Sequence, residues 1–112
     1  MGLFGSKKKK ADILAAYEDV KMADLTGILD EDELDLLATD FWSYGKMRPD
    51  IKELAGDMKV VIKESGSVPA DKLGLCVEAV DAALRTFAAV GMRPDTHVKM
   101  LEKLKQFRAD HR

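Results

Sequence analysis

Three side chains in this sequence belong to types that often do chemistry: its single cysteine, Cys76, and its two histidines, His97 and His111. A nucleophilic cysteine needs a base beside it, and a zinc site needs several ligands. Cys76 falls on the apolar stripe of a predicted helix, where a thiol behaves as a small hydrophobic group. His97 stands near the start of another predicted helix, and we expect it to be exposed and incidental. The sequence therefore predicts no enzyme, no metal site and no cofactor.

Four consecutive acids, Asp30 to Glu33, form the densest group of possible metal ligands. A calcium loop needs oxygen ligands at alternating positions, closed by a bidentate acid. The turn that follows this predicted helix, residues 45–50, carries a single carboxylate. Asp30 with Glu33 three residues later instead matches the capping box of a helix N-terminus. We assign these acids to helix capping.

The first six residues, Met1-Gly2-Leu3-Phe4-Gly5-Ser6, match the pattern for N-myristoylation. Gly2 would carry the acyl chain after removal of Met1, and the lysines at 7–10 supply the second, electrostatic signal that stable membrane binding needs. The same basic start is compatible with import into an organelle. We expect residues 1–10 to form a flexible basic tail with Gly2 as a candidate lipidation site.

Charge is unevenly distributed along the chain, although its net value is only −2. Four lysines give residues 1–10 a charge of +4, and ten acids against one lysine give residues 11–44 a charge of −9. This separation suits docking onto a larger charged assembly, and solvated helix faces explain it equally well. Aromatic residues make up 6% of the chain and do not interleave with a basic stripe, so we expect no nucleic-acid partner.

The elements that position these residues are predicted to be helices joined by sharp turns. Two segments share one order of turn residues, Tyr44-Gly45-Lys46-Met47-Arg48-Pro49-Asp50 and Val90-Gly91-Met92-Arg93-Pro94-Asp95. Because Gly permits left-handed angles, Pro fixes φ and Asp favours a helix N-terminus, each segment predicts a helix, a turn and a second helix. The spacing of the two segments lies in the range of helical-pair repeats.

Apolar residues at helical spacing predict about five helices and no strand. The first helix is expected from about Ala11 to Gly27 and the second from Asp30 to Tyr44; the third starts at Pro49, the fourth at Pro69 and the fifth near Asp95. The fourth contains few charges and is expected to be central. We predict an all-α protein in which residues 11–112 form one domain of antiparallel helical hairpins. These hairpins form either a right-handed superhelix of TPR-like α-α repeats or a compact bundle.

The second turn, Gly91 to Asp95 followed by Thr96-His97-Val98, resembles the junction of a pentatricopeptide repeat, a family of RNA readers. That resemblance implies a small polar base-reading residue at the fifth position of each first helix. This chain has Ala55 and Met100 there, and its repeat spacing is longer.

A second resemblance covers more of the chain, roughly Asp30 to Phe107. The residues that carry it are the acids Asp30 to Glu33, then Trp42, Tyr44 and Lys46, then Pro49-Asp50-Ile51, Val68-Pro69 and Asp81-Ala82-Ala83-Leu84-Arg85. This order resembles subunit Va of mitochondrial cytochrome c oxidase, called subunit VI in fungi. The resemblance implies a small, all-helical accessory subunit without catalytic activity or cofactors. It also implies a place on the matrix side of the inner membrane, docked on the other subunits of the respiratory complex.

Within this assignment we expect a partner-binding surface and no small-molecule substrate. The residues expected to form it are Trp42, Tyr44, Arg48, Asp50, Arg93 and Asp95. The alternative for the two aromatic residues is that they fill the core of the hairpin. The alternative function is a peripheral membrane adaptor on the cytoplasmic face of a membrane, held by a myristoylated, polybasic tail.

The intact mass of the native protein distinguishes these two functions. The adaptor predicts loss of Met1 and the added mass of a fourteen-carbon acyl chain, which Gly2→Ala abolishes. An unmodified chain that co-purifies with haem-containing membrane complexes would instead support the accessory subunit.

Overall fold

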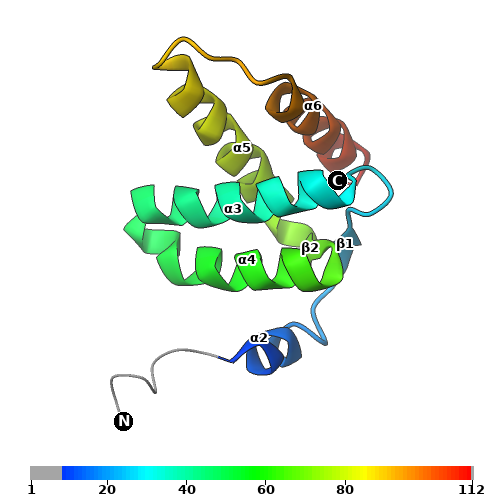
Figure 1. Cartoon of the computed structure of the whole chain (residues 1–112). Coiled ribbons are helices and arrows are strands. Elements are labelled where there is room, and N and C mark those ends of the chain that lie inside the picture. The colour runs from blue at the N-terminus through cyan, green and yellow to red at the C-terminus, as the bar shows by residue number, and fades with distance from the viewer. Residues whose placement is uncertain (1–8, 112) are drawn as a thin grey trace.

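Two helical hairpins and one short N-terminal helix make up most of residues 9–111, the part of the chain that this computed structural model describes (Figure 1). The helices are α2 (Lys10–Ala16), α3 (Glu31–Met47), α4 (Lys52–Ser65), α5 (Leu73–Ala88) and α6 (Asp95–Asp110). The prediction of an all-α protein with about five helices is confirmed. Gly2 and residues 1–8 of the predicted tail lie outside the described residues.

The start of α3 is set by the predicted capping box. The Asp30 carboxylate accepts a hydrogen bond from the Glu33 N–H at 2.8 Å, and the Asp30 N–H donates to the Glu33 carboxylate at 3.0 Å. The helix ends where Pro49 opens a 3₁₀ turn, η1 (Pro49–Ile51), that leads into α4. A proline there loses no helical hydrogen bond, as expected for a first helical position. Local chemistry thus sets both ends of α3.

The α3–α4 hairpin is closed by a glycine. The two helices run antiparallel and side by side (Figure 1), and a Cβ placed on Gly45 would overlap the Cβ of Ala55. Small residues at such a crossing let two backbones approach closely. The glycine of the first repeated turn therefore serves helix packing, since its own φ is not left-handed.

A two-stranded antiparallel sheet is the first departure from the sequence prediction. Strand β1 (Met22–Asp24) pairs with β2 (Ser67–Pro69), with Ala23 opposite Val68. The expected absence of strands is therefore wrong, because strands of three residues are too short to show a periodicity.

The sheet also changes two predicted helix limits. The first helix ends at Ala16 instead of near Gly27, since the chain must turn back to form β1, and Val20 is left 39% exposed. Pro69 belongs to β2, and the 3₁₀ turn η2 (Ala70–Lys72) separates it from α5. The predicted start of the fourth helix at Pro69 is wrong for that reason.

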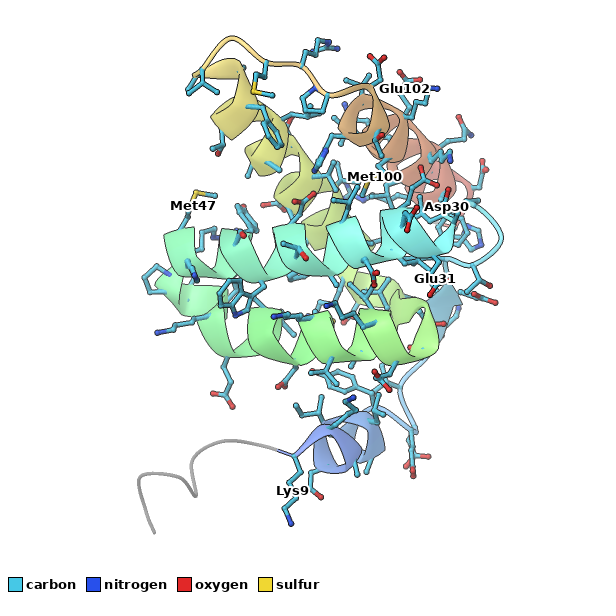
Figure 2. All side chains as sticks on the ribbon, in the orientation of Figure 1. Lys9, Asp30, Glu31, Met47, Met100 and Glu102 are labelled. Carbon is cyan, nitrogen blue, oxygen red and sulfur yellow. The ribbon has the colours of Figure 1, made fainter. Side chains whose placement is uncertain are left out.

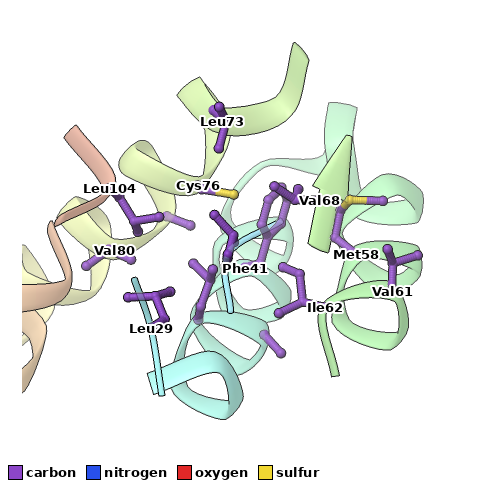
Figure 3. Packing of buried hydrophobic residues seen from close by; sticks show 14 of the residues in the cluster. Leu29, Phe41, Met58, Val61, Ile62, Val68, Leu73, Cys76, Val80 and Leu104 are labelled. Atoms are coloured by element: carbon purple, nitrogen blue, oxygen red, sulfur yellow. The ribbon is translucent and has the colours of Figure 1, made fainter. Parts of the chain in front are cut away.

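The core lies between the hairpins. Phe41 of α3 is fully buried, with Cys76 and Val80 of α5 on one side and Met58 and Ile62 of α4 on the other (Figure 3). Helix α5, the predicted fourth helix, packs against both α3 and α6, and α3 packs against both α4 and α5. The central position predicted for α5 is therefore occupied by α3 and α5 together. A radius of gyration of 14.2 Å corresponds to a compact bundle. Within residues 9–111, no helix is both long enough and apolar enough to cross a bilayer.

Two glycine substitutions test the close approach of α3 and α4. Gly45→Ala is expected to lower the free energy of unfolding by about 1–3 kcal/mol, because the new methyl group overlaps Ala55. Gly56→Ala in α4 meets no atom within 4 Å and should raise it by up to about 1 kcal/mol through helix propensity. Urea titrations followed by circular dichroism measure both. Equal stabilisation by the two alanines would show that the helices can separate without cost.

Candidate functional site

Three of the predicted binding residues come together in one polar network at the α3–α4 turn. The Arg48 guanidinium contacts the Asp50 carboxylate at 2.6 Å and the Glu78 carboxylate of α5 at 3.3 Å. It also donates to the Tyr44 hydroxyl at 3.1 Å, which in turn donates to Glu78 at 2.8 Å. The hydrogen bond from Arg48 holds the pKa of Asp50 below its ordinary value. This network ties the first hairpin to α5.

Trp42 lies outside that network and outside the buried core. Its ring is 38% exposed, with the Lys46 ammonium 3.6 Å and the Lys59 ammonium 4.7 Å from the ring centroid. Two cations over one indole give cation–π contacts between α3 and α4. Trp42 therefore presents a mixed aromatic and basic surface on the α3–α4 hairpin.

Arg93 and Asp95 belong to the other turn, between α5 and α6, and both are exposed. Gly91 takes the left-handed φ of 76° that the sequence predicts for this turn. Among residues 9–111, no hydrogen bond or ion pair joins Arg93 or Asp95 to the network around Arg48. The six predicted residues are thus divided between two turns and one hairpin face.

A groove of about 300 Å³ lies between α3 and α5, and we call it the α3–α5 groove. It exists because α5 presents Ala79 and Ala83, one helical turn apart, to the larger side chains of α3. Its lining residues are Asp40, Ser43, Tyr44 and Met47 of α3 and Ala79, Ala83, Thr86 and Phe87 of α5. The groove is mostly apolar, with a few polar groups, which is the usual character of a binding site.

Asp40 borders this groove and meets His97 of α6 in the interior. Their Oδ2 and Nε2 atoms are 3.0 Å apart, and the residues are 9% and 5% exposed. Neither atom makes a hydrogen bond with acceptable angles. The Phe87 ring packs edge-on against the imidazole, with centroids 5.2 Å apart. The expectation of an exposed, incidental His97 is wrong, because the first turn of α6 packs into the protein.

A second polar contact holds α6 against α3. The Lys103 ammonium lies 3.0 Å from both carboxylate oxygens of Glu33, the residue that also completes the capping box. Glu33 is only 6% exposed, so this ion pair is partly withdrawn from water. Both contacts join residues far apart in the chain, and neither has a local sequence signature.

Burial raises the pKa of the Asp40 carboxyl from 3.8 to about 6, although His97 beside it acts in the opposite direction. Desolvation disfavours a charged carboxylate that lacks enough hydrogen bonds. Sequence reasoning missed this residue. The available signal was an acid set next to the apolar stripe that contains Leu37 and Phe41.

The side-chain types of Ser43, Asp40 and His97 are those of a hydrolytic triad. The defining contact of a triad is a hydrogen bond from the nucleophile to the histidine, and the Ser43 hydroxyl makes no hydrogen bond to His97 within residues 9–111. Cys76 is buried on the apolar stripe, as predicted, and burial raises the pKa of its thiol to about 12. In the described part of the chain, no three potential metal ligands gather.

Comparison of the chain with protein-family models, with curated proteins and with solved structures finds no match.

The effect of pH on stability tests the state of Asp40. Because its pKa is raised to about 6, the folded protein holds this proton more tightly than the unfolded chain. The contribution of Asp40 to stability is largest below pH 3.8 and is lost as pH rises through about 6. Between those values the unaltered protein should lose on the order of 1–2 kcal/mol of unfolding free energy relative to Asp40→Asn.

Urea midpoints at a series of pH values measure this difference. The control is Asp35→Asn, an exposed acid on the same helix, whose stability profile should stay parallel to that of the unaltered protein. A parallel profile for Asp40→Asn would contradict the raised pKa.

Proposed function

We propose that this protein is a non-catalytic interaction protein that binds a partner protein in the α3–α5 groove. The observation that carries the proposal is the exposure of large apolar side chains around the groove. Met47 at the end of α3 is 56% exposed, and Val90 and Met92 in the α5–α6 turn are 71% and 52% exposed. Met47 points away from α4, toward the side on which α5 lies (Figure 2).

A backbone hydrogen bond ties the α5–α6 turn to a residue that lines the groove, and we call Met47, Val90 and Met92 the rim. The Met92 N–H donates to the carbonyl of Phe87 at 2.9 Å, and Phe87 lines the groove. Apolar side chains thus lie at the α3 end and at the α5 end of one hollow. Exposed large apolar side chains that gather around a groove typically mark an interaction site.

The chemistry of the rim favours a protein partner. Methionine side chains are flexible and polarizable, so they adapt to the side chains of a partner. An apolar groove between two helices also matches the mode in which an amphipathic helix lies along a groove. The polar network around Arg48 holds α3 and α5 in place beside the groove.

The residue order Trp42, Pro49-Asp50-Ile51 and Val68-Pro69 supports a more specific form of this proposal. In that form the protein is an accessory subunit of mitochondrial cytochrome c oxidase on the matrix side of the inner membrane. The partner would then be another subunit of the complex. This specific form is supported by the resemblance alone, whereas the groove supports the general one.

Native purification in mild detergent, followed by mass spectrometry, tests both forms. Met47→Glu and Met92→Glu should each reduce the recovered partner by more than about tenfold, because a carboxylate at the rim must be desolvated. Val20→Glu is the matched control, since Val20 is an exposed apolar residue outside the groove. Circular dichroism should show the same helix content for all three variants.

The identity of the partner and one further variant separate the alternatives. Haem-containing membrane subunits among the recovered proteins would support the specific form. If Trp42→Ala released the partner while both glutamate variants at the rim retained it, the binding surface would be the Trp42 face and the groove proposal would be wrong.

A further inference from the structure

The α3–α5 groove holds one charged side chain, Asp40, among its lining residues. Its Oδ2 atom is fully buried and lies 3.0 Å from His97 Nε2, whereas its Oδ1 atom retains solvent access and has no polar partner within residues 9–111. A carboxylate can accept hydrogen bonds at both oxygens, so Oδ1 is the acceptor that this largely buried residue leaves open to the groove. A donor supplied from outside, entering through the groove, would complete the bonding of Asp40.

Charges around the groove favour a cationic donor. Apart from Lys46, every charged residue of α3 is an acid. On the α5 side, Glu78 and Asp81 border a smaller hollow beside the groove, and both are paired, with Arg48 and Arg85 respectively. The negative charge without a basic partner at the groove is therefore that of Asp40, which attracts a positive group and disfavours a negative one.

The shape of the groove fits a long side chain. Ala79 and Ala83 leave room on α5, and Met47 and Phe87 provide apolar walls. Lysine and arginine bury their methylene groups along such walls while the charged end seeks a polar partner. A charge-assisted hydrogen bond to a carboxylate is stronger than a neutral one.

We infer that the groove binds an amphipathic helix of a partner protein that carries one lysine or arginine in its apolar face, and that this cation pairs with Asp40. This inference rests on the proposed function and specifies the partner. The apolar face of the helix contacts Met47 and Met92, and its cation enters between α3 and α5. A purely apolar helix would bury Asp40 further without a partner, which costs free energy.

Three synthetic peptides provide the test. Each is an amphipathic helix with a leucine stripe and a glutamine polar face, and the central position of the stripe is lysine, methionine or glutamate. Each is titrated into the full-length protein, labelled with ¹⁵N. Shifted amide signals of Ser43, Ala79 and Ala83 locate the bound peptide, and the titration gives its affinity.

The lysine peptide should bind in the groove at least about tenfold more tightly than the methionine peptide, and the glutamate peptide should bind most weakly. Asp40→Asn should reduce the preference for lysine to less than about twofold. Asp35→Asn removes the same charge from an exposed site on α3 and should keep the preference. The comparison of the peptides on the unaltered protein remains decisive if Asp40→Asn fails to fold.

The outcomes separate this inference from the proposed function. Equal binding of all three peptides in the groove would overturn the inference and leave the groove as a docking site. A lysine preference weakened equally by Asp40→Asn and Asp35→Asn would also overturn it, because the cause would then be long-range charge. If no peptide shifted the groove signals, the proposed function would fail together with the inference.

Discussion

The burial of Asp40 against His97 is the constraint that links the docking of α6 to the character of the α3–α5 groove. It joins α3 to the start of α6 at an Oδ2–Nε2 distance of 3.0 Å, and it does so where water is largely excluded. Two polar groups in such a place cost desolvation energy, which their mutual contact offsets only in part. The fully buried side chains Met100 and Leu104 of α6 contribute the apolar burial that keeps the helix docked. The α3–α5 groove borders Asp40, so its polar character follows from this packing.

The hairpins owe their precise fit to small residues. Gly45 lets α3 approach Ala55 of α4, and Ala79 and Ala83 leave the groove open between α3 and α5. Small side chains therefore bring α3 and α4 close together and leave a groove between α3 and α5. What differs is the residue opposite: Ala55 fills the space at the first crossing, whereas the walls of the groove remain in contact with solvent.

Polar groups without full satisfaction often mark functional positions, because folding alone would select an apolar residue there. Asp40 fits that description, since burial raises the pKa of its carboxyl and its Oδ2 atom makes no hydrogen bond with acceptable angles. Tyr44, Arg48 and Asp50 do not, because they bond to one another and to Glu78. Their internal pairing assigns them first to holding the hairpins together. Trp42 remains the most exposed aromatic residue of the predicted binding set.

The sequence by itself determined that the protein is helical and where several helices begin and end. The capping box at Asp30, the proline at the start of η1, the left-handed Gly91 and the apolar position of Cys76 all depend on neighbours within a few residues. Only the tertiary structure decided the pairing of β1 with β2, the burial of His97 and the groove beside Asp40. Each of these joins segments that lie far apart in the chain, and the strands are only three residues long. Such contacts depend on how whole helices pack, and a local pattern of side chains does not encode that packing.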